Sequence, residues 1–144
     1  MGDFDSERAP LLKDLAESRA ALVRVIERLK AADFEQARRG SWSVSRILEH
    51  VLHSEKLYTQ LISVFNGVPA NVREATQFGS AADAKSALNS SREAFLSAAQ
   101  EVTEDDFFRL EKIGHEEYSV LSILENNAAH DREHAEQIRR TIES

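Results

Sequence analysis

The 144-residue chain contains no cysteine. Disulfide bonds, thiolate metal ligands and cysteine nucleophiles are therefore excluded. A chain of this length can bury one ordinary hydrophobic core without covalent cross-links, so we expect a single domain over residues 1–144.

Clusters of lysine and arginine are also absent, and the net charge is −7. Because the phosphates of nucleic acids repel an acidic chain, nucleic-acid binding is not expected. No apolar run approaches the ~18 residues that a membrane-spanning helix requires. The polar, acidic N-terminus also lacks the pattern of a secretory signal. These properties predict a cytoplasmic protein that is not associated with a membrane.

Several common catalytic motifs are missing. The sequence has no Gly-x-Ser-x-Gly motif, no glycine-rich phosphate loop and no Glu-x-x-His carboxylate pair, so hydrolase, nucleotide and di-iron chemistry lack their residues. The segment from His130 to His134 reads His-Asp-Arg-Glu-His. It differs from the His-Glu-x-x-His motif of zinc proteases, because its second residue is aspartate and its glutamate directly precedes the last histidine.

Four amphipathic helices are predicted, and no segment has a convincing strand pattern. The first is expected from about Glu7 to Ala31, with Ser6 as its N-cap and Pro10 in its first turn. The second is expected to begin after the capping residue Ser43 and to end near Gly67.

The third helix is expected to begin at the capping-box-like segment of residues 80–83, and the fourth to run from about Ser119 to Ile142. Residues 68–79 and 103–117 are expected to be connecting loops. Four helices of about 20 residues, each with an apolar stripe, indicate an all-α four-helix bundle. The predicted core stripe of the second helix consists of Ile47, Val51, Ser54, Tyr58, Leu61 and Phe65.

The chain contains an internal repeat. Residues 42–50 match residues 118–126 in an aromatic residue, a Ser-Val pair and an Ile-Leu-Glu segment, at an offset of 76. Asp33-Phe34 recurs as Asp106-Phe107, with a slightly different spacing. The repeat predicts two helix pairs related by a pseudo-two-fold axis; the alternative is that one favourable helix start is used twice.

Three histidines depart from this repeat and lie on or beside a predicted core stripe. His130 and His134 are one helical turn apart, on the face that also carries Ile138, and His50 lies near the core stripe of the second helix. Each unsatisfied polar group of a buried imidazole costs ~1–3 kcal/mol, so packing explains three converging histidines poorly. Three neutral imidazoles can bind a divalent metal and leave coordination positions open for water or substrate.

The alternative is an incidental histidine pair without a metal. His53 and His115 lack the core context and are expected near the surface, whereas Asn127 is expected in the pocket wall. The carboxylates near the histidines are expected to face solvent mostly, although one of them could orient a ligand's second nitrogen. They are Glu49, Asp131 and Glu133.

The chain resembles the DinB/YfiT-like superfamily over essentially its whole length. The resemblance is carried by Trp42-Ser43, by His50 seven residues after that serine, and by His130-x3-His134 followed by Ala-Glu-Gln-Ile. The resemblance implies a pseudo-two-fold four-helix bundle, usually dimeric, with His50, His130 and His134 as a metal triad. Members of that superfamily with known activity are mostly metal-assisted transferases or isomerases that use low-molecular-weight thiols such as bacillithiol or mycothiol.

The expected function is therefore that of a metal-dependent enzyme, with thiol S-transfer as the specific hypothesis, because a bound metal lowers the pKa of a thiol. Zinc or nickel is the expected ion, and iron or manganese is also compatible with the site. The expected partners are a small-molecule substrate and a second copy of the chain in a homodimer. The alternative is a non-catalytic stress-response or small-molecule-binding bundle with a structural or vestigial metal site.

Overall fold

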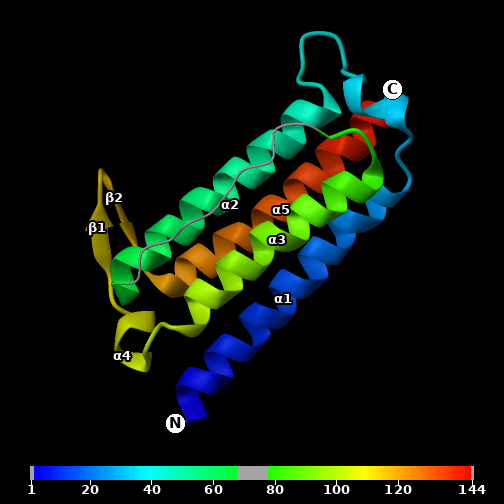
Figure 1. The fold of residues 1–144 in the computed structure, drawn as a ribbon. Helices are drawn as coiled ribbons and strands as arrows, with labels where there is room; N and C mark the ends of the chain where they lie inside the picture. The colour runs from blue at the N-terminus through cyan, green and yellow to red at the C-terminus, as the bar shows by residue number, and fades with distance from the viewer. Residues whose placement is uncertain (1, 68–77, 144) are drawn as a thin grey trace.

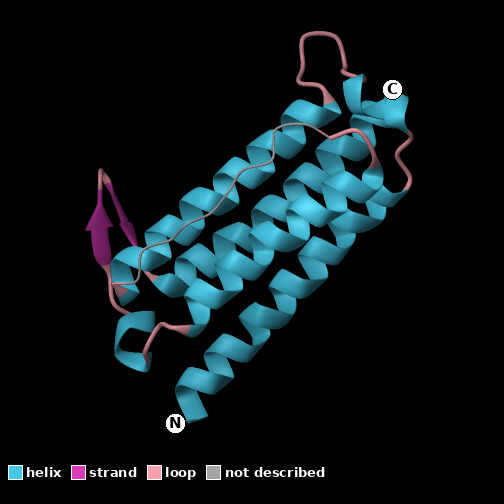
Figure 2. Ribbon diagram, viewed as in Figure 1, coloured by secondary structure: helices cyan, strands magenta, loops and turns pink. Residues whose placement is uncertain are grey.

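The computed structural model describes residues 2–67 and 78–143. The predicted four-helix bundle is observed. In Figures 1 and 2, α1 and α5 run in one direction, and α2 and α3 run in the other. The four long helices are α1 (Gly2–Glu27), α2 (Val44–Asn66), α3 (Ala81–Gln100) and α5 (Val120–Glu143).

Serine side chains cap three of these helices, as the sequence predicts. The Ser43 hydroxyl accepts a hydrogen bond from the Arg46 amide at 3.2 Å, and Ser80 and Ser119 cap α3 and α5 in the same way. Gly67 ends α2 with φ of 71°, a left-handed conformation that glycine adopts without a steric penalty. The ends of α2 and the starts of α3 and α5 therefore follow from local sequence.

The first helix begins earlier than predicted. α1 starts at Gly2, so Ser6 lies inside the helix and is not its N-cap, and Pro10 is likewise internal. The reason is tertiary: the Phe4 ring packs edge-to-face on Phe107 at 5.1 Å, and the Arg8 guanidinium lies 4.6 Å from the Phe4 ring centre. Contacts between distant parts of the chain thus stabilise a first turn that the local pattern does not indicate.

The expectation of no strands is wrong. β1 (Glu111–Ile113) and β2 (Glu116–Tyr118) form an antiparallel hairpin within the region predicted to be a loop. Gly114 in its turn has φ of 69°. Strands of three residues are too short to show the alternation on which strand prediction depends. Most of the other predicted loop, 68–79, lies outside the described residues.

The element order repeats as the internal sequence repeat predicts. η1 (Ala31–Glu35) and an antiparallel bridge lead from α1 to α2, and α4 (Glu104–Phe107) and the hairpin lead from α3 to α5. Phe34 and Phe107, which match in the repeat, are both buried. α1 packs against α5 and α2 packs against α3, two pairs that a pseudo-two-fold axis would exchange.

The apolar core is divided into two clusters. One contains the C-terminal half of α1 with Ile47, Leu48 and Leu88, and the other contains Leu15 with the C-terminal half of α3 and the N-terminal half of α5. The predicted core stripe of α2 is only partly correct, because Ser54, Tyr58 and Leu61 are half-buried. The positions buried in their place are Glu55, Thr59 and Ile62.

A buried ionic layer contains one charged residue from each long helix, and we call it the ionic quartet: Arg19, Glu55, Arg92 and Asp131. Glu55 Oε2 accepts hydrogen bonds from Arg19 at 2.9 Å and from Arg92 at 2.6 Å. Both arginines also bind Asp131, which is 1% exposed. The expectation that Asp131 faces solvent is therefore wrong, because packing of all four helices encloses it.

The ionic quartet follows the internal repeat. Arg19 donates to the Leu88 carbonyl at 2.8 Å, and Arg92 donates to the Leu15 carbonyl at 2.9 Å. The arginine of α1 thus donates to a carbonyl of α3, and the arginine of α3 donates to the equivalent carbonyl of α1. This reciprocal pair is what a pseudo-two-fold axis that exchanges α1 and α3 requires. Asn127 donates a hydrogen bond to Glu55 at 3.0 Å and therefore belongs to this layer. The prediction that Asn127 lines the pocket beside the histidines is wrong.

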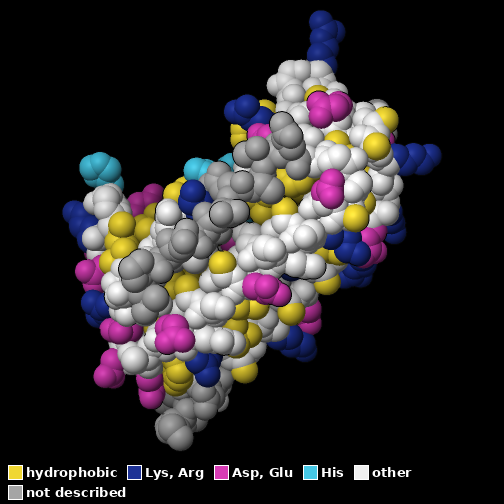
Figure 3. Space-filling model, viewed as in Figure 1, with side chains coloured by type: hydrophobic (Ala, Val, Ile, Leu, Met, Phe, Trp, Pro, Cys, Tyr) yellow, Lys and Arg dark blue, Asp and Glu magenta, His cyan; other side chains and the backbone are white. Residues whose placement is uncertain are grey.

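The surface carries charges of both signs. On the face drawn in Figure 3, acidic and basic side chains are interspersed. No helix in the described part of the chain is long and apolar enough to cross a membrane.

Candidate metal centre

The structure brings together the three histidines that the sequence singles out. His50 comes from α2, and His130 and His134 come from α5, which packs against α2. One ring nitrogen from each of the three imidazoles lies within 4.8 Å of the chosen nitrogens of the other two. Nε2 of His130 and Nε2 of His134 are 3.2 Å apart. The predicted convergence across the two helices is therefore observed.

This spacing suits a divalent metal ion. Two nitrogens bound to one tetrahedral zinc ion at ~2.0–2.1 Å are about 3.3 Å apart, close to the 3.2 Å between His130 and His134. The third imidazole, from His50, lies within reach of the same point. Three neutral nitrogen donors form a set that zinc, nickel and iron all accept, so the residues present fit the metal that the sequence predicts.

A glutamine orients one of the three rings. Gln137, one turn after His134 on α5, places its Oε1 2.7 Å from His134 Nδ1. With the amide oxygen in that position, Nδ1 carries the ring proton and donates it. The lone pair then resides on Nε2, which faces His130. An outer partner of this kind aligns a metal ligand. The sequence suggests a carboxylate for this role, whereas the structure places Gln137 there, three residues after His134 on the same helix.

His50 and His130 are held in the form that binds metal. Burial lowers the pKa of His50 and of His130 below the ordinary value of 6.5, and the neighbouring His134 lowers both further. Glu133 acts in the opposite direction without cancelling these effects. The neutral forms of His50 and His130 therefore predominate at neutral pH, and only a neutral imidazole offers a lone pair to a metal.

The three rings differ in their access to solvent. His134 is buried at 5% exposure, whereas His50 and His130 are half-buried. The Trp42 ring packs against His50 with 5.2 Å between ring centres. His53 and His115 are exposed, as predicted. The site is thus embedded in the bundle on one side and open on the other.

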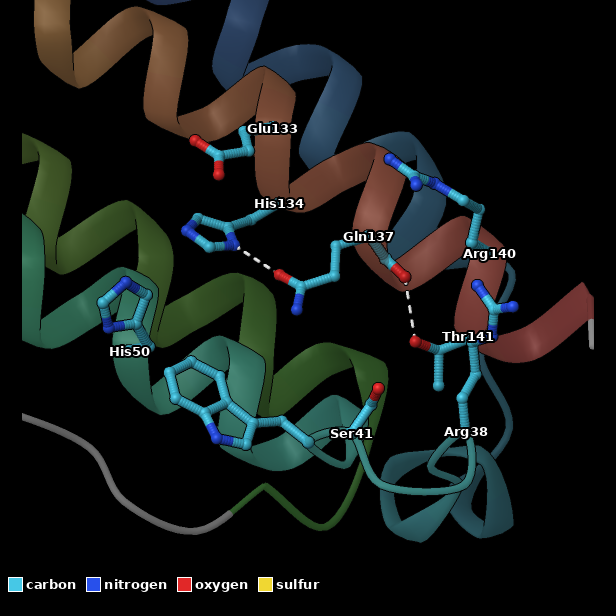
Figure 4. Close-up of a pocket in the computed structure, with 9 residues that line it drawn as sticks. Arg38, Ser41, His50, Glu133, His134, Gln137, Arg140 and Thr141 are labelled. Atoms are coloured by element: carbon cyan, nitrogen blue, oxygen red, sulfur yellow. Dashed lines mark hydrogen bonds between the residues drawn. The ribbon is translucent and has the colours of Figure 1, made fainter.

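A pocket of about 410 Å³ opens beside the histidines (Figure 4). Its wall includes His50, His134, Gln137, Trp42 and the carboxylate of Glu133. Of the three acidic residues considered from sequence, Glu133 is the one at this pocket. Glu49 lines a different one, and Asp131 lies in the ionic quartet. A small molecule could therefore enter beside the imidazoles and reach a metal held by them.

Comparison with known proteins identifies the fold and the family. A family model described as the DinB superfamily matches residues 14–138. The chain is also similar to a solved structure described as the crystal structure of TT2238, a four-helix bundle protein. The TM-score is 0.70 at 19% sequence identity, over 91% of this chain and 96% of that one. At this identity the similarity demonstrates the fold alone. No curated protein sequence matches the chain.

Proposed function

The chain belongs to the DinB superfamily, and on this basis we propose that it is a metal-dependent enzyme whose divalent ion is bound by His50, His130 and His134. The observation that carries the proposal is the convergence of three imidazoles next to an open pocket. Structural metal sites are usually closed by a fourth protein ligand, whereas catalytic sites keep a position for water or substrate. Three histidines beside a pocket correspond to the second arrangement.

We propose zinc or nickel as the ion. The donor set consists of imidazole nitrogens, which these borderline metals favour over the oxygen ligands preferred by magnesium and calcium. The carboxylate of Glu133 lines the same pocket as His50 and His134.

The proposed reaction is the transfer of an electrophilic group to a low-molecular-weight thiol. When bound, the ion acts as a Lewis acid that lowers the pKa of the substrate thiol. Glu133 accepts the thiol proton, because its carboxylate shares the pocket with His50 and His134. The thiolate then attacks the electrophilic carbon, an S–C bond forms, and the leaving group departs with its bonding electrons. The Trp42 ring packs edge-to-face against His50 at one wall of this pocket.

The first prediction concerns the metal itself. We expect the purified protein to bind one zinc or nickel ion per chain and to melt at a higher temperature with the ion, because a ligand that binds only the folded state stabilises it. His134→Ala should abolish metal uptake, and His130→Ala should do the same. The measurements are metal content by mass spectrometry and a thermal melt with and without added ion.

His115→Ala is the matched control, because His115 is an exposed histidine on the hairpin. It should leave metal content unchanged. Circular dichroism of each variant shows whether it is folded. Equal loss of metal from His134→Ala and His115→Ala would contradict the residue assignment. A wild-type protein that neither holds nor responds to the ions would favour the alternative of a non-catalytic bundle.

A further inference from the structure

Two arginines line the same pocket as the histidines. Arg38 lies in the segment between η1 and α2, and Arg140 lies near the end of α5. In Figure 4 the Arg38 guanidinium lies beside Thr141 and the Arg140 guanidinium lies higher in the view, whereas the imidazoles of His50 and His134 lie on the other side of the pocket. The pocket therefore has a metal-binding side and a cationic side.

The positive charge on the cationic side is only weakly balanced by the protein. Among the described residues, no carboxylate lies within ion-pair distance of Arg38. Arg140 approaches Glu136 at 3.5 Å. Glu136 already accepts two hydrogen bonds from Arg139. Arg38 and Arg140 are both exposed, so their guanidinium groups are accessible to an anionic group of a ligand that enters the pocket.

We propose that this pocket selects a thiol that carries a carboxylate, with the thiol directed to the His50–His130–His134 site and the carboxylate bound by Arg38 and Arg140. The inference rests on the proposed function, since it names the substrate class of the same metal site. It adds an anion subsite formed by two residues outside the histidine triad.

The chemistry of the pocket favours a carboxylate. A guanidinium group offers a planar pair of N–H donors that matches the two oxygens of a carboxylate. The side chains of the wall include two arginines and one glutamate, so the arginine side of the pocket attracts an anionic group. The Ser41 hydroxyl, on the same wall, offers a further hydrogen bond.

The test compares two thiols of the same shape on the zinc-loaded protein: 3-mercaptopropionate, which carries a carboxylate, and 3-mercaptopropionamide, which is neutral. Binding is measured by isothermal titration calorimetry, and zinc content is measured after each titration. We expect the carboxylate to bind at least about 10-fold more tightly, because charge-assisted hydrogen bonds to arginine add to thiol binding. Arg38→Gln and Arg140→Gln should each reduce this preference by about 10-fold.

Arg24→Gln is the control, because Arg24 is an exposed arginine on α1 and does not line the pocket. It should keep the full preference, and no arginine variant should change zinc content or the affinity for the amide. If the wild-type protein binds zinc but the two thiols bind equally, or neither binds, the anion subsite is wrong while the metal site stands. If the wild-type protein binds no zinc, the proposed function fails and the inference fails with it.

Discussion

Gln137 illustrates how a single side chain prepares the site. Three histidines alone do not define a metal centre, because each imidazole can present either ring nitrogen. The bond from His134 Nδ1 to Gln137 Oε1 at 2.7 Å selects Nε2 of His134 as the ligand atom. The Trp42 ring at 5.2 Å restricts His50 in a comparable way by packing. Two of the three candidate ligands, His50 and His134, are thus oriented by neighbouring side chains.

Removing this orientation should weaken metal binding without abolishing it. We expect Gln137→Leu to lower zinc affinity by about 10- to 100-fold, the usual effect of losing an outer partner of a ligand histidine. Gln137→Glu keeps an acceptor at the same place and should retain most of the affinity. The measurement is competition with a fluorescent zinc chelator.

Gln60→Leu, at an exposed glutamine on α2, is the control and should leave zinc affinity unchanged. If Gln137→Leu binds zinc as tightly as the wild-type protein does, Gln137 has no orienting role.

The ends of the helices follow from local rules where a cap is present. Ser43, Ser80 and Ser119 each accept a hydrogen bond from the amide three residues later, and these starts are readable from sequence. α1 is different, because its first turn depends on Phe4 packing against Phe107. The hairpin of β1 and β2 is also different, because its strands are too short for a pattern.

The glycine that ends α2 should contribute measurable stability. Gly67 adopts φ of 71°, where a Cβ atom is disfavoured. We expect Gly67→Ala to lower the free energy of unfolding by about 1 kcal/mol, and Gly67→Asn to lower it by less, because asparagine tolerates this conformation better. Urea unfolding of the metal-free protein measures both. Equal losses in the two variants would argue against the conformational explanation.

The ionic quartet organises the molecule as a whole. In each long helix, the residue of the ionic quartet separates the part of the helix that packs in one apolar cluster from the part that packs in the other. Arg19, for example, lies between Leu15 of one cluster and Leu22 of the other. A buried ion pair adds little net stability over an apolar replacement, but removing one partner leaves an uncompensated buried charge. We infer that the quartet defines how the two helix pairs fit together. The homodimer expected from the family resemblance remains a prediction.

The quartet should make folding sensitive to acid. Burial acts to raise the pKa of Glu55, but the Arg19 and Arg92 guanidinium groups lower it more, so the net pKa lies below the ordinary 4.5. The unfolded chain therefore takes up the proton first as the pH falls. The contribution of Glu55 to the free energy of unfolding is fully present above about pH 4.5 and is lost as the pH falls through the folded-state pKa.

Glu55→Gln tests this assignment. At neutral pH it should destabilise the protein by roughly 3–5 kcal/mol, and its stability should fall less steeply than that of the wild-type protein below about pH 4.5. Urea unfolding over a pH series measures both effects. Glu93→Gln, at an exposed glutamate on α3, should match the wild-type curve. A Glu55→Gln curve parallel to the wild-type curve would assign the acid sensitivity to other groups.

The sequence by itself determined the helical class of the protein, most helix ends, and the placement of His50, His130 and His134 on inward helix faces. These features depend on periodicity and capping, which involve residues a few positions apart. The sequence also contains a second match, in which residues 15–22 and 88–95 share Leu, Ser, Arg and Ala at equivalent positions. That match extends the repeat to α1 and α3 and marks Arg19 and Arg92.

Only the tertiary structure decided which of these side chains meet. Arg19 and Asp131 are 112 residues apart in the chain yet form a hydrogen bond, and Arg38 and Arg140 line one pocket from different segments. An arginine or an aspartate on a helix is usually solvated, and only the packing of the other helices makes it buried or places it in a pocket. Local pattern therefore identified the candidate ligands, whereas packing of distant segments determined the ionic quartet, the orienting glutamine and the cationic side of the pocket.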